Sequence, residues 1–351
     1  MKFTSGLVGR MTGTALAAAL LACSMSVMPA KAQEPVELSF SYPTARNQTS
    51  LHRAFGWYFD EVEKRTEGRV KFKQFWGTLL EPLEALDGIS QGIVDSAFVV
   101  PNYWPDKLPL ASSLSSTILF AKDSIRESSQ VFWTLYGEFP QMEEEFTRQN
   151  QKLLWMTSSN GGLVVFSKGP ILKLEDFSGL KIRVPGSVAP WFQAIGATGV
   201  SIPPTEVYDA ISKGVVEGAF VGLESGYRNK WQEVAKHVLN LGAGELMASF
   251  GLSINLDKFK ALSPEDQKVL TDTGQELMEV FASYWEADIP VIAEGLKAQG
   301  VTVSTLSVED QEKWRQMDAL QQTRDAWVAK AESRGLPGRQ FMDRLVELVG
   351  R

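Results

Sequence analysis

One segment of the chain occurs twice, and this repeat constrains the fold more than any other feature. Residues 84–99 (EALDGISQGIVDSAFV) and 206–221 (EVYDAISKGVVEGAFV) are identical at nine of sixteen positions. In each copy a helical stretch ends at a glycine, which takes the left-handed conformation at a helix end without steric cost, and a buried strand follows. The spacing is too long for a solenoid, whose repeats run about 20–50 residues. Two distant copies therefore predict two similar α/β lobes with a cleft between them.

Helical and strand patterns alternate around the two copies. Alternating or buried apolar residues predict strands over 36–42, 69–75, 94–100, 152–156, 163–167 and 250–255. Helices are expected over about 50–67, 123–150 and 227–238, and residues 108–120 are expected to be irregular. Helix alternating with strand indicates an α/β fold with a sheet rich in parallel pairs.

The C-terminal part follows a different pattern. Ser263-Pro-Glu-Asp is a helix-capping pattern, and the rest of the chain is predicted to be mostly helical apart from 301–306. We therefore expect residues 33–157 to form mainly the first lobe and 158–250 mainly the second. Residues 251–351 are expected to return a strand to the sheet and to form a long helical region that braces both lobes.

The N-terminus predicts export. Lys2 and Arg10 are followed by an apolar segment over 15–27, and Ala30-Lys31-Ala32 is typical of a cleavage site, so residues 1–32 are predicted to be a secretory signal peptide. This places the mature chain in the periplasm. Cys23, the single cysteine, offers an alternative, because Leu-Leu-Ala-Cys resembles a lipobox and would tether the protein. The Ala-x-Ala pattern favours cleavage after Ala32.

Composition argues against several function classes. The net charge is −7 and the basic residues are scattered, so nucleic acid is not an expected partner. The two histidines, His52 and His237, are predicted to be surface or capping residues, and no metal cluster, nucleophile elbow or phosphate loop is found. Glu143-Glu144-Glu145 is interpreted as a solvated helical face. No enzyme activity, cofactor or metal is predicted.

Arg183 is the principal candidate for ligand binding. Leu180, Ile182 and Val184 alternate with Lys181 and Arg183 before a Pro-Gly break, so the arginine lies at a strand end, where open α/β sheets bind ligands. A guanidinium offers a planar pair of donors that fits a carboxylate. The alternative is an arginine on a solvated sheet face, the usual place of a charged strand residue.

Other candidates lie at neighbouring breaks in the pattern. Trp104 and Trp191 follow strand ends, and each either contacts a ligand or packs in the core like most of the ten tryptophans. Four further residues are predicted to bind the ligand: Tyr42, Tyr103, Asn160 and Glu224.

Three segments of the chain resemble those of a known family. The segments Gly-Leu-Lys-Ile-Arg-Val-Pro (179–185), Glu-Val-Tyr (206–208) and Gly-Val-Val-Glu-Gly (214–218) resemble the solute receptors of TRAP (tripartite ATP-independent periplasmic) transporters, of the DctP type. The resemblance implies the two-lobed periplasmic binding protein fold, a small organic acid bound between the lobes, and delivery to membrane permease subunits. It also implies that Arg183 pairs with the carboxylate of the ligand.

Two departures from the family pattern narrow the ligand. Members that bind sialic acid carry an arginine twenty residues earlier, where this chain has Leu163, and the frequent cleft asparagine is replaced by Val-Gly-Leu-Glu (221–224). The departures argue against sialic acid and favour a monocarboxylate with an apolar or aromatic body. Two alternatives remain. The chain is a binding protein for another importer or for a sensor kinase, or it is a periplasmic enzyme.

Overall fold

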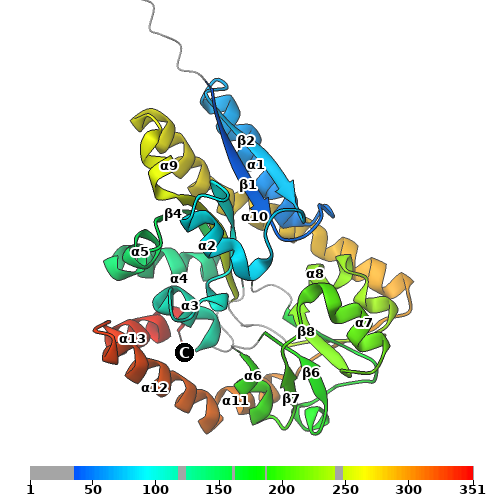
Figure 1. Cartoon of the computed structure of the whole chain (residues 1–351). Helices are drawn as coiled ribbons and strands as arrows, with labels where there is room; N and C mark the ends of the chain where they lie inside the picture. Colours follow the sequence, from blue (N-terminus) through cyan, green and yellow to red (C-terminus); the bar gives the residue numbers. More distant parts are fainter. Residues whose placement is uncertain (1–34, 118–123, 160–162, 186–187, 242–247, 351) are drawn as a thin grey trace, which may run out of the picture. The chain divides into compact units, whose positions relative to one another are not determined.

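Two mixed β-sheets form the centre of the fold (Figure 1). The computed structural model describes residues 35–117, 124–159, 163–185, 188–241 and 248–350. The expected signal peptide, Cys23 and Asn160 lie outside these ranges. Within them, no helix is long and apolar enough to cross a membrane.

The first sheet combines N-terminal strands with one strand from much later in the chain. Its order is β2 (Val70–Trp76), β1 (Val36–Tyr42), β3 (Ser96–Val99), β10 (Ala248–Asn255) and β4 (Gln151–Ser159). The pairs β1–β2 and β1–β3 are parallel, whereas β10 is antiparallel to β3 and β4. Strand β10 therefore returns a late segment of the chain to the first sheet.

The second sheet has six strands. Its order is β11 (Thr302–Thr305), β9 (His237–Asn240), β5 (Leu163–Ser167), β8 (Gly218–Gly222), β6 (Lys181–Arg183) and β7 (Thr198–Val200). The pairs β6–β7, β6–β8 and β9–β11 are parallel, and β5 is antiparallel to β8 and β9.

The sequence repeat corresponds to a repeat of structure. Each copy holds a short helix, α2 (Ala85–Ser90) or α7 (Val207–Ser212), and then a central strand, β3 or β8. Gly92 and Gly214 both have φ of +73°, so the chain leaves both helices through the left-handed conformation. Each central strand has one parallel and one antiparallel neighbour. The two copies therefore place equivalent residues at equivalent sheet positions.

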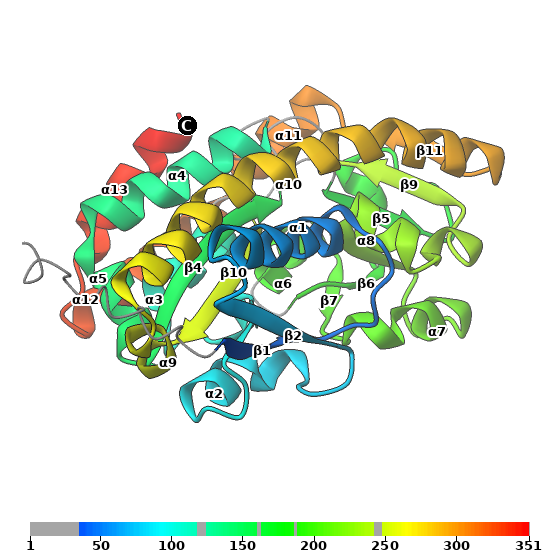
Figure 2. The ribbon, with the colours of Figure 1, turned by 90° about the horizontal axis from the view of Figure 1, so that it is seen from above.

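Helices cover the sheets and continue to the C-terminus (Figures 1 and 2). The remaining α-helices are α1 (Ser50–Arg65), α3 (Pro109–Ser116), α4 (Ile125–Glu138), α5 (Pro140–Thr147), α6 (Ala189–Ala194), α8 (Leu223–Arg228), α9 (Leu256–Ala261), α10 (Pro264–Ala298), α11 (Val308–Arg315), α12 (Asp318–Ser333) and α13 (Gly338–Val349). Short 3-10 helices are η1 (Pro82–Glu84), η2 (Pro101–Tyr103), η3 (Leu174–Phe177), η5 (Pro204–Glu206) and η6 (Trp231–Glu233).

Helix α10 is the longest of the described elements, and it contacts elements near both sheets. Ser263 caps it, because its side chain accepts a hydrogen bond from the backbone N–H of Asp266, as the sequence pattern predicts. The helix packs along α1, where Figure 2 shows the two side by side, and it also contacts β4, α4 and α8. The long helical C-terminal region is thereby confirmed, while the expected lobe boundaries stay predictions.

Three expectations about secondary structure are wrong. Residues 108–120 were expected to be irregular but contain α3, whose buried Leu110, Ala111 and Leu114 outweigh its four serines. The helical region over 123–150 is two helices, because Pro140 begins a new one after Phe139. The helix expected over 227–238 is replaced by the end of α8, by η6 and by β9.

Candidate functional site

A cavity of about 350 Å³ is lined by residues of both sheets and their flanking elements. This volume lies within the range of small-molecule sites. The lining includes the expected residues Tyr42, Tyr103, Arg183 and Glu224. Other lining residues include Asn47, Thr49, His52, Phe98, Phe220, Phe250, Phe281 and Trp285.

Arg183 is buried in this lining and has no ionic partner among the described residues. It ends β6 and the residue is 6% exposed, which excludes the solvated sheet face. Its Nε donates to the carbonyl of Ile202 at 2.8 Å and its Nη1 to that of Phe220 at 3.2 Å. Burial lowers the pKa of Arg183, and the electrostatic partner that opposes this shift is Tyr103, with no carboxylate contributing. An arginine remains charged even so. A buried cation that is hydrogen-bonded to two carbonyls and to no carboxylate favours the binding of an anionic ligand.

Tyr103 lies next to this cation. It ends η2 and lines the cavity, and its hydroxyl pKa is raised by burial against the opposing charge of Arg183. Trp104 packs edge-on against the Tyr103 ring, with centroids 5.8 Å apart. The indole itself is in the core, and its Nε1 donates to the carbonyl of Leu83 at 3.2 Å. Trp104 is not among the described residues that line the cavity, so the expectation that it lines the site is corrected; its ring packs against Tyr103, which does line it.

Glu224 joins the two sides of the cavity. Its carboxylate accepts hydrogen bonds from the backbone N–H of Ser50 at 2.7 Å and from the Ser50 hydroxyl at 2.5 Å, across 174 residues of sequence. Ser50 begins α1, so the carboxylate satisfies an N–H at a helix N-terminus. Burial raises the pKa of Glu224 to about 7, against the Ser50 hydrogen bonds and with the help of Asp288.

An ionic network continues from this contact. Asp288 of α10 pairs with Arg53 of α1 at 2.7 Å and with Arg228 of α8 at 3.2 Å. All three residues are at least partly buried. The network ties α8, which follows the second sheet's central strand, to α1 and α10.

The two copies of the repeat contribute matching walls. Phe98 of β3 and Phe220 of β8 occupy the same position in the sixteen-residue repeat, and both line the cavity. The repeat is itself a sequence signal for these two residues, because a residue that recurs at one position of two facing lobes is a candidate for the cleft between them. Phe250, Phe281 and Trp285 add to this apolar wall.

Trp191 is placed wrongly by the sequence prediction. Its side chain is 1% exposed and packs in the core of the second sheet, and its carbonyl accepts a hydrogen bond from the Trp314 indole at 3.1 Å. It does not line the cavity. A tryptophan on the inner face of an amphipathic helix buries more area there than in a cleft.

His52 and Glu145 are also corrected. His52 was expected to be a surface or capping residue; it is not on the surface, because it is 1% exposed and lines the cavity, and His237 lies in β9 rather than near a helix end. Glu145 was interpreted as solvated, yet it is 2% exposed and accepts hydrogen bonds from the backbone N–H groups of Leu110 and Ala111 at 2.6 and 3.1 Å.

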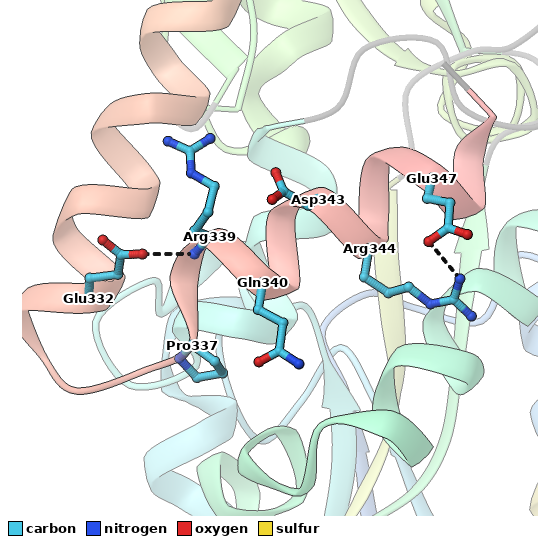
Figure 3. A pocket seen from close by; sticks show the side chains of 7 residues that line it. All are labelled: Glu332, Pro337, Arg339, Gln340, Asp343, Arg344 and Glu347. Atoms are coloured by element: carbon cyan, nitrogen blue, oxygen red, sulfur yellow. Dashed lines mark hydrogen bonds and ion pairs between the residues drawn. The ribbon is translucent and has the colours of Figure 1, made fainter.

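A second hollow lies on the surface of α13 and the end of α12 (Figure 3). Most of its charged side chains form ion pairs or hydrogen bonds within the protein. Arg344 pairs with Glu138 at 2.7 Å and with Glu347 at 2.9 Å, and Arg339 pairs with Asp325 at 3.2 Å. The first cavity, with its unpaired arginine, is therefore the candidate site. Across the described ranges, no group of three or more His, Cys, Asp or Glu side chains could hold a metal ion.

Comparison with known proteins agrees with this arrangement. The sequence model of the DctP family, bacterial extracellular solute-binding protein family 7, matches residues 40–326, and the chain belongs to this family. Among curated relatives, the 2,3-diketo-L-gulonate-binding periplasmic protein YiaO of Escherichia coli K12 is 28% identical over 83% of this chain and 87% of its own length.

Solved structures of TRAP solute-binding proteins share the fold. A protein from Rhodoferax ferrireducens, in complex with copurified benzoate, has a TM-score of 0.80 at 22% identity and covers 90% of this chain and 97% of its own. A protein from Bordetella bronchiseptica, with bound (R)- and (S)-mandelate, has a TM-score of 0.78 at 25% identity, with coverage of 90% and 99%. The two-lobed periplasmic binding protein fold is thus confirmed.

Proposed function

We propose that this chain is an extracytoplasmic receptor that captures a small organic acid with one carboxylate and delivers it to a TRAP-type secondary transporter. The observation that carries the proposal is the buried Arg183 guanidinium, which faces a cavity of about 350 Å³ and has no carboxylate partner among the described residues. Burying an unpaired charge is costly, so a ligand carboxylate would supply the missing interaction.

The cavity walls favour an apolar or aromatic body for this acid. Aromatic rings from both sheets and from α10 contribute to the lining, whereas Arg183 is the one arginine or lysine among the described residues that line it. A second carboxylate would meet Glu224, which would repel it. The names of related receptors point in the same direction, since two of them were solved with benzoate or mandelate.

Partner, location and absence of catalysis belong to the same proposal. Family membership supports a role in binding rather than in catalysis, and the curated relative from Escherichia coli is periplasmic by name. We infer that the chain acts in the periplasm and hands its ligand to membrane permease subunits. Adjacent genes for one large and one small permease subunit would favour this partner over another importer or a sensor kinase.

The proposal is tested in two stages. Mass spectrometry of material released from the purified protein should find a monocarboxylic acid. Calorimetry should then show that benzoate binds, that benzamide, which has the same ring without the charge, binds far more weakly, and that the dicarboxylate phthalate gains nothing. Stabilisation by dicarboxylates alone, or equal binding of benzoate and benzamide, would contradict the proposal.

A further inference from the structure

The two copies of the repeat allow the surroundings of Arg183 to be compared with the same position in the first sheet. Arg183 of β6 pairs in parallel with Ala219 of β8. Ser41 of β1 pairs in parallel with Ala97 of β3. The two alanines occupy the same position of the sixteen-residue repeat. Arg183 and Ser41 are therefore equivalent residues of the two sheets, and only the second sheet has a cation there.

A second difference lies in the turn before each repeat helix. The turn is a 3-10 helix in both copies, η1 and η5, and its first residue is Pro82 or Pro204. The residue before that proline is Glu81 in the first copy, with φ −73° and ψ 157°. In the second copy it is Pro203, with φ −55° and ψ 144°. The copy that accompanies the arginine thus has an additional proline, although Glu81 adopts a similar conformation without a pyrrolidine ring.

This additional proline is linked to the arginine through one peptide group. The Nε of Arg183 donates to the carbonyl of Ile202 at 2.8 Å, and that carbonyl belongs to the peptide bond between Ile202 and Pro203. The orientation of this peptide group is set by ψ of Ile202 and φ of Pro203. The proline ring fixes φ at about −65° and restricts ψ of the preceding residue to extended values. Pro203 therefore restrains the acceptor of the Nε–H group on both sides.

We propose that Pro203 is a positioning residue, which orients the Ile202 carbonyl so that the Arg183 guanidinium is held toward the carboxylate of the ligand. The inference rests on the proposed function and adds a residue that sets how strongly the site prefers an anion. Nε bonds to this restrained carbonyl and Nη1 to the carbonyl of Phe220, so two acceptors determine the plane of the guanidinium. A side chain that is already ordered loses less conformational entropy when the ligand binds.

Two simpler roles for this proline differ from positioning in what they affect. A proline that only restricts the unfolded chain stabilises the fold and leaves ligand affinity unchanged. A proline that only forms part of the wall affects charged and neutral ligands alike, and Pro203 does line the cavity. A proline that positions a guanidinium affects charged ligands more than neutral ones, and it does so only while the guanidinium is present.

The test measures the preference for an anion as a ratio of two affinities. Calorimetric titration of the intact protein would compare benzoate with benzamide, and mandelate with mandelamide. In Pro203→Ala the ratio of acid to amide affinity should fall about three- to tenfold, the effect of loosening one hydrogen bond, while the amide affinity changes by less than about twofold. The exposed position and the backbone angles of Pro203 are accessible to alanine, so the variant should fold. Pro203→Gly has a freer backbone and should lower the ratio further.

A double-mutant cycle with Arg183→Lys shows whether the effect passes through the arginine. Lysine has no Nε–H in a planar group, so in the lysine background Pro203→Ala should change the affinity for the acid by less than about twofold. Pro170→Ala is the matched control, because Pro170 is an exposed loop residue after β5 and is not among the described residues that line the cavity. This control should leave the ratio unchanged.

The outcomes separate this inference from the proposed function. The positioning role is refuted, and the proposed function stands, if an acid binds the wild type but the ratio is unchanged in both Pro203→Ala and Pro203→Gly. The same conclusion follows if Pro203→Ala weakens acid binding equally with arginine and with lysine at position 183, or if it lowers only the thermal stability. If no monocarboxylate binds the wild type, the proposed function fails and this inference fails with it.

Discussion

Arg183 shows how much one residue's burial changes its interpretation. At the level of sequence it could be a solvated strand residue or a ligand anchor. Its 6% exposure and its two bonds to main-chain carbonyls leave the guanidinium rigid and its charge unneutralised. Rigid placement matters because less conformational entropy is lost when the ligand binds.

We predict that Arg183→Lys weakens binding of the native acid by about tenfold to a few hundredfold, because hydrogen bonds to charged groups are worth about 1.5–3 kcal/mol and lysine keeps the charge without the planar pair of donors. Calorimetry measures this, with thermal unfolding to show that the fold persists. Arg339→Lys, on the exposed surface of α13, is the control and should bind normally. An unchanged affinity in Arg183→Lys would remove this residue from the site.

Glu145 leads to a prediction about pH. Burial raises its pKa from 4.5 to about 8, against two backbone hydrogen bonds. Between these values the unfolded chain has lost the proton and the folded chain keeps it. The free energy of unfolding should therefore fall as pH rises through this window, by up to about 1.4 kcal/mol per pH unit, and the contribution is fully present below pH 4.5.

Glu224, whose pKa is raised to about 7, adds a slope of the same sign between pH 7 and 8, and this slope is common to the wild type and to the variants below. The difference in slope between wild type and variant therefore reports Glu145. Denaturant unfolding across that range should show a smaller slope in Glu145→Gln than in the wild type. Glu144→Gln changes the exposed neighbour and should keep the wild-type slope. Equal slopes in Glu145→Gln and the wild type would mean that Glu145 is already ionised in the folded protein.

The shared backbone geometry of the two repeat copies depends on the residue that follows each helix. The glycines that follow α2 and α7 have the same positive φ, and each directs the chain into the central strand of a sheet. An L-residue in that conformation crowds its Cβ against the following carbonyl. The conserved geometry of the two copies thus depends on two residues without side chains.

We predict that Gly92→Ala lowers the free energy of unfolding by about 1 kcal/mol, wholly through backbone strain, because a Cβ there would meet no atom within 4 Å. Gly137 near the end of α4 has equally open surroundings without positive φ. Gly137→Ala should therefore stabilise the protein by about 0.5–1 kcal/mol. Chemical denaturation of both variants measures the contrast, and a shift of the same sign in both would refute the conformational explanation.

The cavity walls come from both sheets, and the hydrogen bonds from Ser50 to Glu224 join α1, which follows β1, to α8, which follows β8. A ligand that touches both walls has different contact free energy in open and closed arrangements, which is the condition for a ligand-driven shift. The alternative is a rigid, pre-formed pocket.

We predict that saturating ligand lowers the radius of gyration in small-angle scattering, as hinge closure requires. Glu224→Gln should weaken this response, because a neutral amide holds the N-terminus of α1 less strongly than a carboxylate. A radius that is identical with and without ligand, in a sample shown by calorimetry to be saturated, would favour the rigid pocket.

Several features of the fold are encoded in local sequence patterns. The repeat, the alternation of helix and strand, the capped start of α10 and the strand-end position of Arg183 all follow from periodicity and from residues such as Gly92 and Ser263. These features depend on neighbours within a few residues, so a single sequence contains the information.

Tertiary structure alone decided which side chains meet. Trp191 packs against Trp314, Glu145 caps α3, and Glu224 binds Ser50, in each case through partners between 34 and 174 residues away. The same reason explains why Phe98 and His52 were missed while Trp104 and Trp191 were chosen. A large ring or a charge is equally suited to a core and to a cleft, and only the packing of distant elements fixes which surface it faces.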